Sequence, residues 1–164
     1  MRRRIAFAVP TSLLALAFTA SSMLAAATIH NLDVEFSGTT VTATADVSGL
    51  GSQKPANAQL TVNGQALYEC RNGGGQVVPG QNPQPARTTS PVQDLGNTTN
   101  NRRGVVDVSA TLSAPTTINA RTAGCPNGKT WTATLLSVEV TSATLTLKQG
   151  GQTFFQQTFD NPNN

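Results

Sequence analysis

The two cysteines are the residues of this chain with the clearest capacity for chemistry. Cys70 ends an apolar stretch, and Cys125 lies about 55 residues later in the turn-like sequence Gly-Cys-Pro-Asn-Gly. An even number of cysteines in an exported chain normally pairs, and two cysteines allow one intramolecular pairing. A redox role would need a Cys-x-x-Cys spacing or a free thiol. We therefore predict a structural disulfide that ties two loops together at one pole of the domain.

Other reactive groups are scarce and poorly placed for catalysis. The only histidine, His30, is predicted to lie beside the mature amino terminus, a poor position for a Ser-His-Asp arrangement. Asp33, Glu35 and Asp46 could offer oxygen ligands to calcium, but a solvated acidic face is the interpretation that we prefer. With both cysteines paired, a transition-metal centre lacks ligands. We predict a non-catalytic protein without a metal or a cofactor.

The first 27 residues have the pattern of a secretory signal peptide. Three arginines follow Met1, an apolar run covers residues 5–20, and Ala25-Ala26-Ala27 supplies a cleavage site before Thr28. An uncleaved anchor is the alternative, which the shortness of the apolar run disfavours. We predict a secreted protein, extracellular or associated with the cell wall, that has no membrane contact after cleavage.

Removal of the signal peptide changes the charge balance. Three of the eleven Lys and Arg residues lie in it, which leaves eight cations against eight acids. A near-neutral chain disfavours nucleic acid as a partner, because nucleic-acid-binding domains normally carry net positive charge. The remaining stretch, 28–164, has the length of one domain with its own core.

Alternation of apolar and polar residues predicts short strands along the mature chain. Residues 31–36 and 41–47 form two of them, joined by a turn at Gly38-Thr39 that makes them antiparallel neighbours. Further strands are expected at 56–70, 92–95, 106–112 and 116–120, and between 131 and the end of the chain. No stretch has a capped helical period. The pattern favours an all-β fold, an immunoglobulin-like antiparallel β-sandwich of about seven or eight strands with one disulfide, and a closed barrel is the alternative.

One parity, continuous across the Asn63-Gly64 pair, is shared by the apolar residues Ala58, Leu60, Val62, Ala66, Tyr68 and Cys70. A two-residue hairpin at Asn63-Gly64 would place the later apolar residues on the opposite face. We therefore predict one long strand kinked at Gly64, with a three-residue hairpin loop as the alternative.

Two features of the carboxyl-terminal strands leave alternatives open. The apolar phase changes twice between Trp131 and Leu147, and each change needs either a bulge or a tight turn. At the Gly150-Gly151 turn, a two-residue loop would oppose Leu147 to Phe154, whereas a three-residue loop would pair Leu147 with Phe155. Trp131 and Tyr68 fall on the apolar phase, which predicts packing in the core near the disulfide, with a sugar-stacking platform as the alternative.

The segment 71–91 is rich in Gly, Pro, Gln and Asn and has no apolar period, which predicts one long loop. Loops of this length in compact domains are often functional. The disulfide would hold this loop beside the segment around Cys125, and cations concentrate in both. The predicted binding residues are Arg71, Asn72, Gly80, Gln81, Asn82, Arg87, Arg121 and Lys129. Such a pole could dock an anionic cell-wall polymer or an extracellular protein.

Three stretches carry a resemblance to a known group of proteins. They are Tyr68-Glu69-Cys70-Arg71-Asn72, Pro79-Gly80-Gln81-Asn82-Pro83, and Gly124-Cys125-Pro126-Asn127 followed by Trp131-Thr132-Ala133. They resemble small exported proteins of uncharacterised function in actinomycete-type bacteria. The resemblance implies a secreted one-domain β-protein and transfers no functional residue.

These features predict a secreted, non-catalytic protein that binds a partner or the cell envelope through the loop after Cys70. Two alternatives belong to other classes. A protease inhibitor would present the 71–91 loop as a substrate-like segment, and a secreted hydrolase is compatible with the compartment alone.

Overall fold

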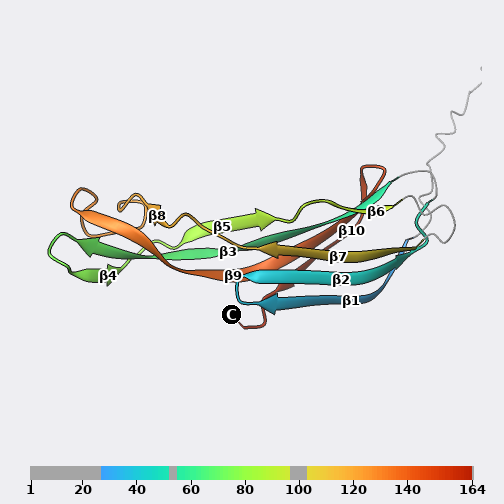
Figure 1. The fold of residues 1–164 in the computed structure, drawn as a ribbon, viewed down its shortest axis with the longest axis horizontal. Coiled ribbons are helices and arrows are strands. Elements are labelled where there is room, and N and C mark those ends of the chain that lie inside the picture. Colours follow the sequence, from blue (N-terminus) through green and yellow to red (C-terminus); the bar gives the residue numbers. More distant parts are fainter. Residues whose placement is uncertain (1–26, 52–54, 97–102, 164) are drawn as a thin grey trace, which may run out of the picture.

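The computed structural model describes residues 27–51, 55–96 and 103–163, which form ten strands and no helix (Figure 1). The strands are β1 (Thr28–Ser37), β2 (Thr40–Ser48), β3 (Ala56–Asn72), β4 (Val77–Pro79), β5 (Gln84–Thr89), β6 (Gln93–Gly96), β7 (Arg103–Thr111), β8 (Thr117–Ile118), β9 (Trp131–Gln149) and β10 (Gln152–Asp160). Within these ranges, no helix has the length and apolarity needed to cross a bilayer. Residues 1–26, nearly all of the predicted signal peptide, lie outside the description.

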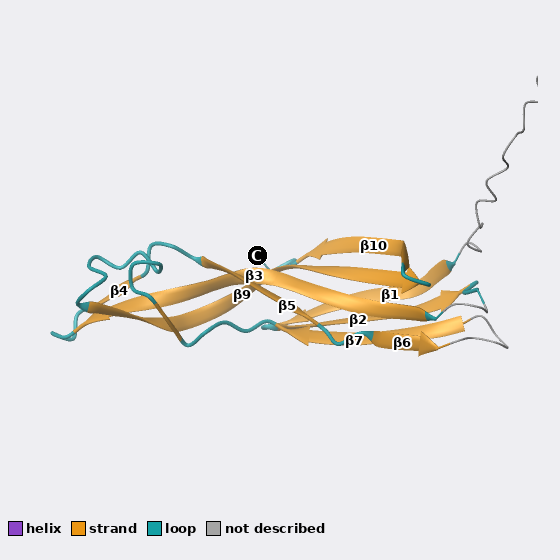
Figure 2. Ribbon diagram, turned by 90° about the horizontal axis from the view of Figure 1, so that it is seen from above, coloured by secondary structure: helices purple, strands orange, loops and turns teal. Residues whose placement is uncertain are grey.

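The strands form two antiparallel sheets that pack face to face over part of their length. The smaller sheet has the order β1-β2-β7, and the larger one has the order β10-β9-β3-β4, with β10 at one edge. Along the free edge of β3 lie β4, β5 and β6, while β8 pairs with β9. Figure 2 shows the small sheet covering only one end of the long β3–β9 ribbon. The all-β antiparallel fold is confirmed, and the described residues contain more strands than the expected seven or eight.

Strand β3 runs without interruption from Ala56 to Asn72, so the prediction of one long strand through Gly64 is confirmed. Its apolar residues at even positions are all buried, from Ala56 to Cys70, whereas Leu67 has the opposite parity and is only partly buried. At Gly64 the backbone of β9 comes so close that a Cβ atom would collide with the carbonyl oxygen of Glu139. Glycine is needed here because of this close approach.

Strand β9 is continuous, and each of the two changes of apolar phase predicted between Trp131 and Leu147 is a bulge and not a turn. The pairing with β3 shifts by one residue between Leu67 and Tyr68, where Leu136 is extra, and between Asn63 and Gly64, where Thr141 is extra. Each bulge reverses which side of β9 faces inward, so the apolar residues on both sides of it stay on the core face. Leu136 itself is 59% exposed.

The last hairpin combines the two expected registers. Gly150 and Gly151 form a two-residue turn between Gln149 and Gln152, and a shift after Thr153 then pairs Leu147 with Phe155. One extra residue, Phe154, therefore converts the first register into the second.

The prediction that 71–91 is one long loop is wrong in part, because this segment contains β4 and β5. Arg71 pairs with Val77 in a tight return, and Gln84–Thr89 then pairs with β3 from Thr61 to Ala66. The strands of this segment could not be recognised from the sequence, because its side chains are mostly polar and so show no alternation of apolar and polar residues. It runs along an open sheet edge, where backbone pairing with β3 suffices to hold it.

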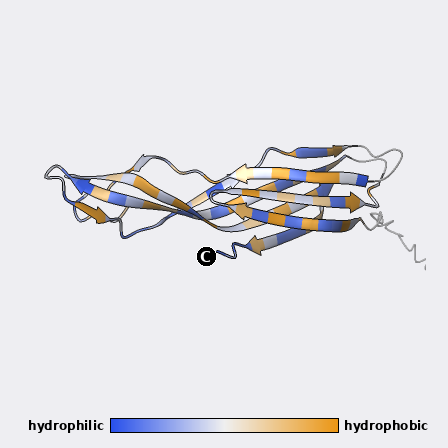
Figure 3. Ribbon diagram, turned by 60° about the horizontal axis from the view of Figure 1, so that its bottom comes forward, coloured by the Kyte–Doolittle hydropathy of each residue, from blue (hydrophilic) through white to orange (hydrophobic). Residues whose placement is uncertain are grey.

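Two separate apolar clusters support the two ends of the molecule. The large cluster lies between the sheets and includes Val41, Leu60, Val106 and Leu145. The small cluster lies beyond Gly64 and consists of Ala66, Tyr68, Ala123 and Ala133. Figure 3 shows hydrophobic and hydrophilic residues alternating along the strands of both parts. The β3–β9 ribbon thus extends out of the sandwich into a second, smaller packing unit.

Candidate functional site

The extension of the ribbon beyond Gly64 carries the predicted binding residues and forms the candidate site. We call it the disulfide pole and define it as residues 65–85 and 113–139. Cys70 on β3 is bonded to Cys125, with their Cα atoms 5.6 Å apart, so the predicted pairing is confirmed. Cys125 belongs to the loop between β8 and β9, and its N–H donates to the carbonyl of Ala120 at 2.9 Å. The bond therefore ties this loop to the middle of the pole.

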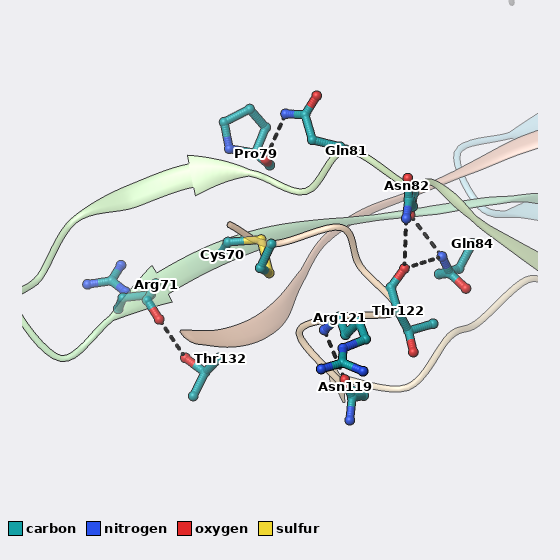
Figure 4. Close-up of a disulfide and its surroundings, with 11 residues drawn as sticks. Cys70, Arg71, Pro79, Gln81, Asn82, Gln84, Asn119, Arg121, Thr122 and Thr132 are labelled. Carbon is teal, nitrogen blue, oxygen red and sulfur yellow. Dashed lines mark hydrogen bonds between the residues drawn. A yellow bond between two sulfur atoms is a disulfide. The ribbon is translucent and has the colours of Figure 1, made fainter. Parts of the chain in front are cut away.

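Gly80 and Asn82 hold the segment after Cys70 against the same loop. The Gly80 N–H donates to the Tyr68 carbonyl at 2.7 Å, and the Asn82 N–H donates to the Ala123 carbonyl at 3.1 Å. A Cβ atom on Gly80 would lie 2.7 Å from the Ala123 carbonyl oxygen, so the approach requires glycine. Figure 4 shows the side-chain amides of Asn82 and Gln84 converging on the Thr122 carbonyl, at 3.4 and 3.1 Å. The two loops are thus joined by hydrogen bonds as well as by the disulfide.

A small core beneath these loops fixes their position. Tyr68 is buried, as predicted, and its hydroxyl donates to the Pro115 carbonyl at 2.9 Å. Ala123, from the loop itself, is fully buried against Ala66 and Ala133. Trp131 departs from the prediction: it is only partly buried and belongs to neither apolar cluster. Trp131 is the first residue of β9 and lies opposite Asn72. The first residue of β9 that belongs to the small cluster is Ala133.

Three cations occupy exposed positions on the pole. Arg71 forms an ion pair of 3.4 Å with Glu69, two residues earlier on the same strand. Arg121 and Lys129 are exposed and have no ion-pair partner among the described residues. Both follow the same local motif, because the backbone N–H of each donates at 2.9 Å to an asparagine side chain two residues earlier, Asn119 and Asn127. These turns fix the backbone from which each cationic side chain extends.

Two further predicted residues shape the tip of the pole. The Asn72 side-chain oxygen accepts hydrogen bonds from Gly74 N–H at 3.0 Å and Gln76 N–H at 2.9 Å, which closes the β3–β4 turn. Gln81 is exposed, and its amide donates to the Pro79 carbonyl at 3.4 Å. Asn72 therefore has a structural role in the turn, whereas Gln81 presents its side chain at the surface.

Arg87 is the one predicted binding residue that the fold separates from the others. It lies on β5 opposite Asn63, at the boundary between the pole and the sandwich. There it lines an open groove of about 560 Å³. Its neighbours in the lining include Gln65, Pro85 and Thr141, which sequence reasoning missed. The only available signal was Gly64 itself, which also lines this groove.

Charge is distributed unevenly along the molecule. The pole has three cations, Arg71, Arg121 and Lys129, against two acids, Glu69 and Glu139. The described part of the sandwich has three cations against six acids. Those acids are Asp33, Glu35, Asp46, Asp94, Asp107 and Asp160. Among the described residues, the excess of positive charge therefore lies on the pole and the excess of negative charge on the sandwich.

The histidine lies at the far end of the sandwich from the pole. His30 Nε2 is 3.3 Å from Ser48 Oγ in an exposed pocket of about 480 Å³ that Arg103 also lines. The neighbouring Asp46 carboxylate accepts a 2.8 Å hydrogen bond from Asn31, and no described bond joins it to His30. Among the described residues, no group of three His, Cys, Asp or Glu side chains is close enough to hold a metal ion.

Comparison with known proteins finds no family model, curated protein or solved structure that matches the chain. The resemblance to small exported actinomycete-type proteins therefore stays a prediction, and the function is argued from the geometry of the site alone.

Proposed function

We propose that this protein is a secreted, non-catalytic binding protein that docks an anionic partner through the disulfide pole. The partner is a polymer of the cell envelope or an acidic surface of an extracellular protein. The observation that carries the proposal is the placement of Arg121 and Lys129, two unpaired cations on a loop that is held rigid. A preformed loop loses little conformational entropy on binding, so its charges contribute more to affinity.

The construction of the pole supports a binding role. The sandwich has its own apolar cluster, so the smaller cluster and the disulfide serve chiefly to position the two loops. Partly exposed Trp131 starts the strand directly after the Lys129 loop. An indole beside cations suits a polymer that combines sugar rings with negative charge. A disulfide also fits the oxidising compartment that the predicted signal peptide implies.

An immunoglobulin-like relationship belongs to the same proposal and applies to the sandwich part alone. Its support is the face-to-face packing of two antiparallel sheets. The disulfide here joins a strand to a loop, whereas that of antibody domains bridges the two sheets.

The protease-inhibitor alternative has less support from the geometry. An inhibitory loop offers its backbone to the protease as an extended strand. In the segment 71–91, β4 and β5 use one backbone edge to pair with β3. The exposed turn at residues 73–76 is too short and glycine-rich to present a rigid substrate-like segment.

A titration with anionic and neutral polymers tests the proposal. Dextran sulfate and inorganic polyphosphate serve as anionic probes, and dextran of matched length is the neutral control. Trp131 is the only tryptophan, so its fluorescence reports binding at the pole directly. We expect binding of the anionic probes that weakens with added salt. Equal behaviour of dextran and dextran sulfate would refute the proposal.

A further inference from the structure

Strand β10 is a sheet edge that is open along its outer side. It pairs with β9, and no other described strand contacts its second edge. After the shift at Phe154, the pairing is regular from Phe155 to Asp160. An open edge presents a row of backbone donors and acceptors to any strand that can align with it.

The other sheet edges carry features that prevent such pairing. On β7, the Gln93 side chain accepts a hydrogen bond from the Asp107 N–H at 2.9 Å and donates to the Val105 carbonyl at 3.2 Å. The edge formed by β4 and β5 is short and contains proline in each strand. Strand β1 is long, but Asp33 and Glu35 both point to solvent. Charge, proline or a capping side chain thus protects the edges of β1, β4, β5 and β7, and β8 has only two residues, whereas β10 has a long regular edge without such a feature.

The regular part of β10 is also complementary to itself. Residues 155–159 read Phe-Gln-Gln-Thr-Phe, which has no charge, proline or glycine and is nearly symmetric about Gln157. Phe155, Gln157 and Phe159 pair with Leu147, Leu145 and Ala143 of β9, so they lie on the inner face of the sheet. Both phenylalanines are only partly buried against the core, and Gln157 is exposed.

We propose that β10 pairs antiparallel with β10 of a second copy of this chain, about a two-fold axis at Gln157. In this register Phe155 of one copy lies opposite Phe159 of the other, and the two Gln157 side chains face each other. Aromatic residues directly opposite one another stabilise antiparallel pairs, and no like charges meet. The same operation on β1 about Val34 would place Asp33 opposite Glu35, which disfavours that edge. The contact is isologous and closes as a dimer.

Charge substitutions at the axis test this register. The purified protein, Gln157→Lys and Gln157→Glu are each measured by sedimentation over about 1 µM to 1 mM. We expect the unmodified protein to dimerise. Each variant places two like charges opposite each other, so its dimer should be roughly fivefold or more weaker. An equimolar mixture of the two variants should dimerise again, because the introduced lysine then faces the introduced glutamate.

A matched control and three outcomes separate this proposal from others. Gln152→Lys makes the same change on the same strand, before the regular segment, and should leave dimerisation unchanged. A monomer at all concentrations would overturn the proposal, as would a dimer that Gln157→Lys does not weaken. Open-ended fibres would mean head-to-tail pairing of β10 with another edge and would also overturn it. Thermal unfolding of each variant verifies that the exposed substitution leaves the fold intact.

Discussion

The backbone of Gly64 on β3 lies directly against the carbonyl oxygen of Glu139 on β9, with no space for a side chain between them. This contact marks the boundary between the two packing units. On one side β3 and β9 are covered by the small sheet, and on the other they carry the disulfide pole. The ribbon passes from one environment to the other through the bulge beside this glycine.

Substitution of Gly64 by alanine should therefore destabilise the protein strongly. The added methyl group meets backbone, which cannot move without breaking the β3–β9 pairing. We expect a loss of about 2 kcal/mol or more in the free energy of unfolding, measured in urea. Gly73→Ala is the matched control, because no atom beyond its own two neighbours in the chain lies within 4 Å of the added carbon. A loss for Gly64→Ala no larger than that of the control would contradict the close approach.

Loss of the disulfide should destabilise the pole first. Replacing both Cys70 and Cys125 by serine removes a cross-link across 55 residues, which corresponds to about 4 kcal/mol in the chain-entropy model. Hydrogen exchange should show the amides of residues 123 and 125 losing protection before the amides of β2. Uniform loss of protection across both units would show that they unfold together and that the pole has no independent stability.

Removing the hydroxyl of Tyr68 should lower the free energy of unfolding only slightly, because the ring stays in the small apolar cluster. Tyr68→Phe keeps the ring in the small cluster and deletes the hydrogen bond to the Pro115 carbonyl. We expect a decrease of about 1 kcal/mol in the free energy of unfolding. Tyr68→Ala, which also empties the cluster, should cost about 3 to 5 kcal/mol. Similar losses for the two variants would mean that the ring does not contribute to packing.

The edge of β7 should open when its capping side chain is removed. Gln93→Ala deletes the hydrogen bonds to Val105 and Asp107 that take the place of a neighbouring strand. Faster hydrogen exchange at the Asp107 amide, with β2 unchanged, is the expected result. Gln65→Ala, on the exposed face of β3, should leave that amide unaffected. An unchanged Asp107 exchange rate in Gln93→Ala would show that the side chain does not protect this edge.

The sequence predicted two kinds of feature: those that follow from the alternation of apolar residues along a strand, and those that follow from the pairing of cysteines. The shared parity of Ala58, Leu60 and Val62 with Ala66, Tyr68 and Cys70 indicated an unbroken strand, and the cysteine count indicated the disulfide; both are confirmed. Parity also showed that β9 changes face twice, although it could not distinguish bulges from turns. That choice depends on β3, which is long enough to pair with all of β9.

The remaining features depend on tertiary contacts that leave no periodic signal. Strand β5 is polar and held by backbone pairing, so its sequence resembles that of a loop. Alternation showed which residues of β3 face inward but not that two different clusters cover them. Of the predicted binding residues, Arg87 was misplaced because the chain returns along β3 before reaching it. Arg121 and Lys129 lie on the loop that the disulfide ties to β3, and their binding role stays a prediction.

The central claim, that the cations of the pole bind an anionic partner, is tested most directly by two double variants. Arg121→Gln with Lys129→Gln removes two cations from the pole, and Arg103→Gln with Lys148→Gln removes two from the sandwich, so the net charges of the variants are equal. The affinity for dextran sulfate is measured through Trp131 fluorescence. We expect roughly tenfold weaker binding for the pole variant and less than about a twofold change for the sandwich variant. Equal losses in the two variants would contradict the claim, because binding would then follow net charge and not the pole.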